Sequence, residues 1–171
     1  NIGEGKLEGT KDNHILYYLG CAMEGLNDQE KAKAYYTLAA VGTEEPAGMM
    51  YYNDQPADMI LYQGLANLKL SKTKEAKSRF YKLVDYGEKH IFDHVKIEYF
   101  AVSLPDFLIF NEDLNKRNKT HCYYLLGLGN LGLGHGEKAK EYFEKAVALD
   151  HCHMNGILYK KSIDFINQIR E

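Results

Sequence analysis

The sequence predicts an all-α fold built from helical hairpins that repeat along the chain. Each repeat is marked by a glycine, an alanine 12 residues later and an aromatic residue 4 positions further on. This set occurs three times: Gly20, Ala32 and Tyr36; Gly64, Ala76 and Phe80; Gly127, Ala139 and Phe143. Self-similarity at a fixed internal spacing is typical of helical repeats. Apolar residues at helical spacing around each set support the same prediction.

Length and composition fit a single soluble repeat domain over residues 1–171. The chain has 45% hydrophobic and 26% charged residues, as globular proteins do. Its net charge of −3 gives no electrostatic footprint for nucleic acid. No stretch is long and apolar enough to span a membrane, and no signal peptide is present. The chain does not begin with methionine, so we expect it to be a fragment of a longer protein.

Three cysteines without a CxxC pair argue against a disulfide framework or a zinc knuckle. Free thiols of this kind fit a reducing compartment, and we expect a cytoplasmic location.

The first hairpin begins at Asp12-Asn13, which offers an N-cap. Apolar residues then recur at helical spacing from 15 to 26, and Asn27-Asp28 breaks the helix. A second helix follows over about residues 29–40, with Gly42 as its candidate C-cap.

The second hairpin starts near Pro56, which is tolerated before or within the first turn of a helix. Apolar residues follow from 59 to 70, and residues 71–73 form the turn. The return helix is predicted to run from Lys74 to about residue 86, with Gly87 just beyond its end.

The third hairpin contains an apolar helix over 122–133, a Gly-His-Gly turn at 134–136 and a partner helix over 137–149. A last amphipathic segment would shield the exposed face of this repeat, as a terminal cap does. We therefore expect units at about 12–42, 56–87 and 119–150, an insert at 88–118 and a capping helix at about 155–170.

These residues resemble the tetratricopeptide repeat. The third unit carries the best match: Tyr123, Leu126-Gly127, Ala139, Phe143 and Ala146, although His151 replaces the closing proline. The second unit departs most, with Gln63 before its glycine and Leu83 in place of the second alanine. The resemblance covers roughly 100 of the 171 residues. It implies an α-solenoid with a right-handed superhelix.

The unit spacing predicts two inserts, because the glycines are 44 and 63 residues apart where about 34 is usual. Within the longer insert, residues 96–103 and 107–110 are apolar, and their period does not decide between strand and helix. The insert is either a packing wedge or a functional loop. Both inserts resemble those in C-terminal repeat regions of large bacterial proteins that carry an N-terminal β-rich domain of unassigned function.

The resemblance also implies a partner-binding groove lined by the first helix of each hairpin. Carried over residue by residue, its positions are His14, Tyr17, Cys21, Glu24, Asp58, Leu61, Leu65, Leu68, His121, Tyr124, Leu128 and Leu131. Such a groove would take a peptide, a helix or a sugar. Alternatively, the chain's own inserts or neighbouring helices fill it. The Lys, Arg and Asn clamp that chaperone adaptors use for a C-terminal carboxylate is missing.

The remaining candidate motifs indicate no chemistry. His90 and His94 are four residues apart but lack convincing further metal ligands, and adjacent residues in the 151–153 run would point apart. The GxGxxG letters at 127–132 lie inside a helical unit, where they indicate close helix packing. We expect no metal, no cofactor and no catalytic residues.

The sequence therefore predicts a non-catalytic interaction or scaffolding module. Its partner would be a protein or peptide, or another domain of the parent chain, bound through the concave face. Two alternatives stay open: an accessory C-terminal domain of a larger bacterial carbohydrate-related protein, and a self-association module. The sequence leaves the oligomeric state undecided.

Overall fold

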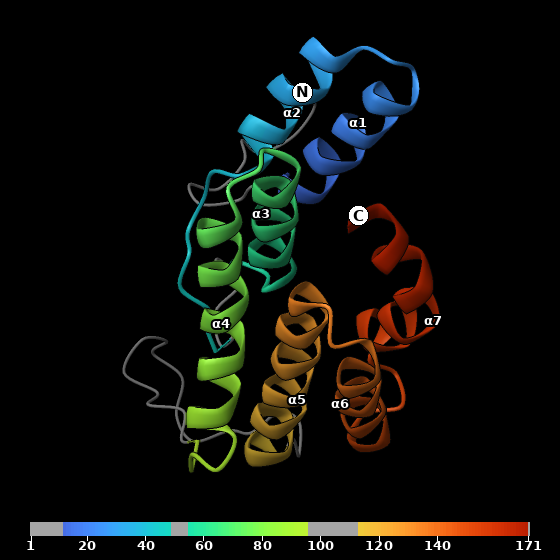
Figure 1. Cartoon of the computed structure of the whole chain (residues 1–171). Coiled ribbons are helices and arrows are strands. Elements are labelled where there is room, and N and C mark those ends of the chain that lie inside the picture. Colours follow the sequence, from blue (N-terminus) through green and yellow to red (C-terminus); the bar gives the residue numbers. More distant parts are fainter. Residues whose placement is uncertain (1–11, 49–54, 96–112, 171) are drawn as a thin grey trace, which may run out of the picture.

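A computed structural model describes residues 12–48, 55–95 and 113–170. These ranges contain helices and no strand, which confirms the all-α prediction (Figure 1). The helices are α1 (Asn13–Gly25), α2 (Gln29–Ala39), α3 (Asp58–Lys69), α4 (Thr73–His90), α5 (Leu114–Leu133), α6 (Gly136–Leu149) and α7 (Met154–Arg170). None of the helices in the described ranges is long and apolar enough to cross a membrane.

Consecutive helices pack as three antiparallel hairpins, α1 with α2, α3 with α4 and α5 with α6 (Figure 1). The hairpins also pack on one another, because α3 contacts both helices of the first hairpin and α4 packs along α5. The last helix, α7, lies on α6 and also reaches α3 and α5. The chain thus forms a continuous row of helices whose final member turns back onto the first helices of the second and third hairpins.

The recurring glycines let the two helices of each hairpin approach closely. A Cβ atom built on Gly20 would lie 2.4 Å from the ring of Tyr36, and one on Gly127 would lie 2.4 Å from the ring of Phe143. At Gly64 the corresponding distance to Phe80 is 2.2 Å. No side chain fits at these distances, so each glycine provides the space that its repeat's aromatic ring fills.

Two further glycines of α5 face the preceding hairpin. A Cβ on Gly129 would lie 2.7 Å from the backbone oxygen of Phe80, and one on Gly132 would lie 2.2 Å from the Phe80 ring. The GxGxxG letters therefore serve helix packing, as the sequence indicates, and the ring of Phe80 lies between Gly64 and Gly132.

The three hairpin turns share one backbone geometry at matching positions. Asn27, Ser71 and Gly134 adopt left-handed φ values of 61°, 60° and 86°. After each of them, the next residue's N–H donates to a carbonyl five residues back, at 2.8–2.9 Å. This is the bond pattern of a Schellman helix end. Only the third turn uses glycine, so composition alone does not show that the three turns are equivalent.

Helix ends differ from the prediction on both sides of the long insert. Gly87 lies inside α4, which continues to His90, and α5 begins eight residues earlier than expected, at Leu114. A Cβ on Gly87 would lie 2.9 Å from the Cys122 carbonyl oxygen, so Gly87 marks close helix contact and not a helix end. Asp113 caps α5, since its carboxylate accepts the N–H groups of residues 115 and 116 at 3.0 Å.

The predicted insert at 88–118 therefore overlaps both helices and is shorter than expected. Its apolar stretches at 96–103 and 107–110 lie outside the described residues. In the first hairpin, α2 ends at Ala39 with Ala40 as its C-cap, so Gly42 does not cap it.

Candidate partner-binding site

Most of the predicted groove residues are packed inside the chain. Tyr17, Leu61, Leu65 and Leu128 are at most 1% exposed. Asp58, Tyr124 and Leu131 are also buried, whereas the remaining five members are half-buried: His14, Cys21, Glu24, Leu68 and His121. In this structure the apolar part of the predicted groove thus belongs to the hydrophobic core, and a partner would reach it only if helices separated.

The chain's own aromatic residues fill the space beside these positions. The ring of Tyr17 lies 5.7 Å from that of Tyr62, centroid to centroid. From α7, Tyr159 stacks on Phe143 at 5.8 Å and lies 6.1 Å from the ring of Tyr124. In this part of the molecule, neighbouring helices therefore occupy the predicted groove.

A buried carboxylate ties α7 to the first helices of the second and third hairpins. Asp58, the first residue of α3, accepts hydrogen bonds from the Tyr124 hydroxyl at Oδ1 and from the Tyr159 hydroxyl at Oδ2, 3.1 Å away. Asn155 Nδ2 donates to the same Oδ2 at 3.3 Å. The Tyr159 hydroxyl also lies 3.3 Å from that of Tyr62. The Asp58 carboxylate thus accepts hydrogen bonds from side chains of both α5 and α7.

The electrostatics of this cluster follow from its burial. Loss of solvent raises the pKa of Asp58 above its ordinary range, and the hydrogen bonds from Tyr124 and Tyr159 partly oppose that shift. Burial, followed by the nearby Asp58 charge, raises the pKa of Tyr124 well above its usual value. The tyrosine hydroxyls therefore remain protonated and act as hydrogen-bond donors to the carboxylate.

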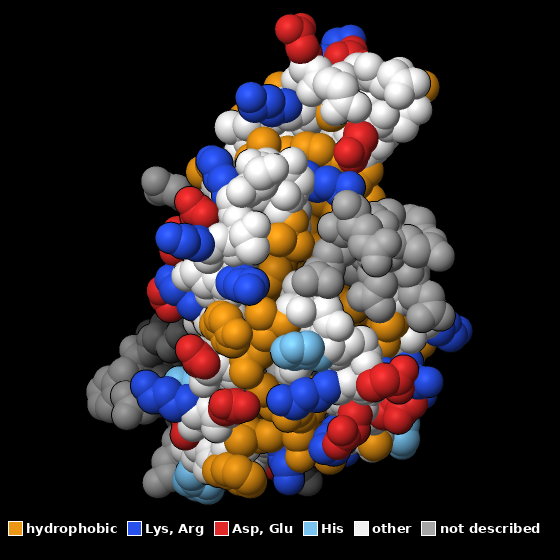
Figure 2. All heavy atoms as spheres, in the orientation of Figure 1, with side chains coloured by type: hydrophobic (Ala, Val, Ile, Leu, Met, Phe, Trp, Pro, Cys, Tyr) orange, Lys and Arg blue, Asp and Glu red, His pale blue; other side chains and the backbone are white. Residues whose placement is uncertain are grey.

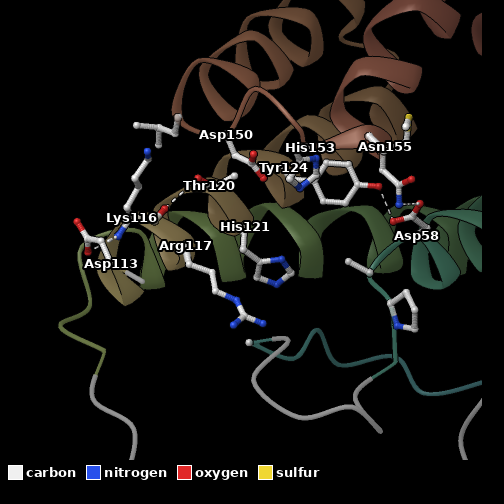
Figure 3. A pocket seen from close by; sticks show the side chains of 15 residues that line it. Asp58, Asp113, Lys116, Arg117, Thr120, His121, Tyr124, Asp150, His153 and Asn155 are labelled. Carbon is white, nitrogen blue, oxygen red and sulfur yellow. Dashed lines mark hydrogen bonds between the residues drawn. The ribbon is translucent and has the colours of Figure 1, made fainter. Parts of the chain in front are cut away.

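A pocket of about 790 Å³ opens directly beside this cluster (Figure 3). One face of α5, the connection from α6 to α7 and the segment that precedes α3 form its walls. Three of the predicted groove residues come together in its lining: Asp58, His121 and Tyr124. The pocket thus contains one part of the predicted groove.

Two histidines in the pocket hold neighbouring segments in place. His121 Nε2 lies 2.8 Å from the Ala47 carbonyl oxygen, so it donates a hydrogen bond that ties α5 to the chain before α3. His153 accepts the Gly156 N–H at Nδ1, 3.0 Å away, which places its proton on Nε2. The His153 ring lies 4.7 Å from that of Tyr124. The rings of His153 and Tyr124 form one wall of the pocket.

Charged side chains of both signs line the other parts of the pocket. Lys116 and Arg117 come from the first turn of α5, and in Figure 3 Arg117 and His121 point toward the segment before α3. Asp113 and Asp150 also line it, and each uses a carboxylate oxygen to accept backbone N–H groups. The pocket therefore offers cationic donors, anionic acceptors and aromatic surface.

Sequence reasoning missed most of this lining, including the polar residues Lys116, Arg117, His153 and Asn155. The basic run at 116–119 is visible in the sequence, but apolar periodicity does not show that a helix already begins at Leu114. Residues 117, 121 and 124 then follow at helical spacing on one face. Recognising Asp113 as an N-cap would have been the signal to extend the helix.

The two histidine motifs that the sequence does not support as metal sites, His90/His94 and the 151–153 run, make ordinary local contacts. His90 Nδ1 lies 2.6 Å from an Asp93 carboxylate oxygen. In the 151–153 run, the first two residues are exposed and only His153 lines the pocket. The described part of the chain contains no group of three or more residues placed to hold a metal.

Charge is mixed across the molecular face in Figure 2. Lys and Arg side chains alternate there with Asp and Glu, and hydrophobic side chains form a band between them. Among the described residues on this face, no large area carries one sign of charge.

No family model matches the chain, and no solved structure matches it.

Proposed function

We propose that the chain is a non-catalytic interaction module that docks a peptide segment in the pocket beside α5. The segment would belong to a partner protein or to another domain of the parent chain. One observation carries the proposal: where α7 leaves the face of the first helices uncovered, the structure has a pocket with Asp58, His121 and Tyr124 in its lining.

The chemistry of the lining favours an extended peptide with an acidic residue. Lys116 and Arg117 are exposed cations on adjacent positions of α5, suited to a carboxylate. Asp113 and Asp150 supply acceptors for peptide N–H groups. Tyr124 and the two histidines supply planar contact surface at low entropy cost. A mixture of donors and acceptors along one wall suits a peptide backbone better than an apolar ligand.

We further infer that the hairpins are of the tetratricopeptide type and form a solenoid. The glycine–aromatic contacts and the matching turns support this inference, because each recurs at the same place in all three hairpins. The cysteines in the described ranges are free thiols, which fits the reducing cytoplasm that we propose as its location.

Affinity selection from a random peptide library displayed on phage tests the docking proposal. We expect enriched peptides to carry acidic residues, and Lys116→Glu to weaken their binding about tenfold or more, because a hydrogen bond to a charged group contributes about 1.5–3 kcal/mol. Lys77→Glu is the matched control: it makes the same charge change on an exposed residue of α4 that does not line the pocket. Failure to enrich any sequence, or equal binding by both variants, would refute the pocket as the docking site.

A further inference from the structure

The first helix carries an apolar stripe that the described chain leaves open to solvent. Ile15, Leu19 and Leu26 are 50%, 37% and 72% exposed, and Ala22 is exposed between them. Steps of four, three and four residues keep all four side chains on one face of a helix. This is the spacing with which two helices pair along a narrow seam.

The same face is covered in each of the other two hairpins, and in the third hairpin it packs against a helix. The matching positions of α5 lie on α4: a Cβ on Gly87 would lie 2.7 Å from Leu126, and one on Gly129 would lie 2.6 Å from Val84. In α3 and α5 the matching residues are buried or half-buried: Met59, Gln63, Ala66, Leu70, Cys122, Leu126, Gly129 and Leu133. The stripe on α1 is therefore a helix-docking face without a helix on it among the described residues.

Charge does not oppose pairing of two such faces. Glu24 is the one Asp, Glu, Lys or Arg residue of α1. Its carboxylate accepts a hydrogen bond from the Tyr36 hydroxyl at 2.6 Å and lies 3.4 Å from Lys69 Nζ. Glu24 thus interacts with α2 and the end of α3, so that two copies of α1 can meet without burying an unpaired charge.

The stripe is complementary to itself when two copies run antiparallel. A twofold axis between positions 19 and 22 places Leu19 opposite Ala22 of the other copy, and Ile15 opposite Leu26. The large side chain of Leu19 then meets a small one, which permits close approach. Contacts of this kind close a symmetric dimer, because each copy contributes the same patch.

We propose that this protein forms a twofold dimer in which α1 pairs antiparallel with α1 of a second copy. The occupant of the docking face is thus a second molecule of the same chain. The interface lies on α1, whereas the pocket proposed above lies beside α5, so each proposal can fail without the other.

Sedimentation equilibrium over a range of concentrations tests the dimer. We expect a species of twice the 19.6 kDa chain mass, and we expect Leu19→Glu to be monomeric while its circular dichroism stays helical. Leu38→Glu is the matched control, because Leu38 is 57% exposed on α2 and lies outside the stripe. A wild-type chain that stays monomeric, or a dimer that survives Leu19→Glu, would overturn the proposal.

Disulfide trapping tests the antiparallel geometry independently. With the exposed native thiol removed by Cys152→Ser, the double variant Ile15→Cys/Leu26→Cys should form a covalent dimer on mild oxidation. Ile15→Cys alone should not, because its two copies would lie about 16 Å apart along the paired helices, 11 residues at 1.5 Å each. Cross-linking of the single variant, or no cross-linking of the double variant, would contradict the antiparallel arrangement.

Discussion

Gly127 has no room for a side chain, because a Cβ there would lie 2.4 Å from the ring of Phe143. We expect Gly127→Ala to lower the free energy of unfolding by about 1–3 kcal/mol through overpacking. Gly25→Ala is the control, since a Cβ at this helical glycine meets nothing within 4 Å. That change should be neutral or stabilising by up to about 1 kcal/mol. Urea unfolding of both variants measures the difference, and equal effects would show that the glycine–aromatic contact does not restrict Gly127.

Asp58 should make stability depend on pH in a defined direction. Burial raises its pKa in the folded chain above that in the unfolded chain. Between these two pKa values the folded state binds more protons, so the stability contributed by this group falls as pH rises through the interval. Asp58→Asn lacks the titrating group. We therefore expect wild-type stability, relative to Asp58→Asn, to fall as pH rises from the ordinary Asp range of about 4.

Urea unfolding of both proteins at a series of pH values measures this difference. Other titrating groups are common to the two chains and cancel to first order. A wild-type advantage that grows with pH would mean that the hydrogen bonds from Tyr124 and Tyr159 outweigh burial at Asp58.

At this scale the sequence was informative where contacts recur and uninformative where they do not. The glycine–aromatic pairs could be predicted because their spacing repeats three times in the chain. The Asp58 cluster could not, since Tyr124 and Tyr159 lie 66 and 101 residues away and belong to helices whose mutual placement no local pattern specifies.

The element that decides how much of the groove stays open is α7. Its Tyr159 hydroxyl bonds to Asp58 and lies within hydrogen-bond distance of Tyr62, while its ring stacks on Phe143. We expect Tyr159→Phe to keep the stacking, to lose the hydroxyl bonds and to cost about 1–3 kcal/mol, because one partner is a charged acceptor. Hydrogen exchange should accelerate in α7 before it does so in α5 and α6.

Tyr81→Phe is the matched control for that change, because Tyr81 is exposed on α4. It should alter neither stability nor exchange. If Tyr159→Phe behaved like this control, the hydroxyl would not anchor α7.

Helix bounds were predictable where apolar periodicity reaches the helix end. The first turns of α5 are polar, so periodicity places its start at residue 122, whereas the N-cap at Asp113 sets it at Leu114. At the end of α4, Gly87 has the composition of a stop signal, but packing against Cys122 and Leu126 keeps the helix going. In both places a tertiary or capping contact overrides the local composition.

At the scale of the whole molecule, the repeat pattern predicts which residues face the inner side of the hairpins but not whether that side is open. Most of those residues are buried here, partly under α7, and the pocket remains beside α5. The amphipathic pattern of residues 155–170 predicts a helix, and the structure has α7 in this range. Where that helix lies follows from long-range contacts with α3 and α5.

The central claim is that a peptide docks in the pocket beside α5. Chemical-shift mapping of the isotope-labelled chain, titrated with a peptide from the phage selection, tests it most directly. We predict that the shifted resonances cluster at Lys116, His121, His153 and their neighbours, with α2 unaffected. Shifts concentrated on α2 or on the exposed stripe of α1, with the pocket residues unchanged, would contradict the account.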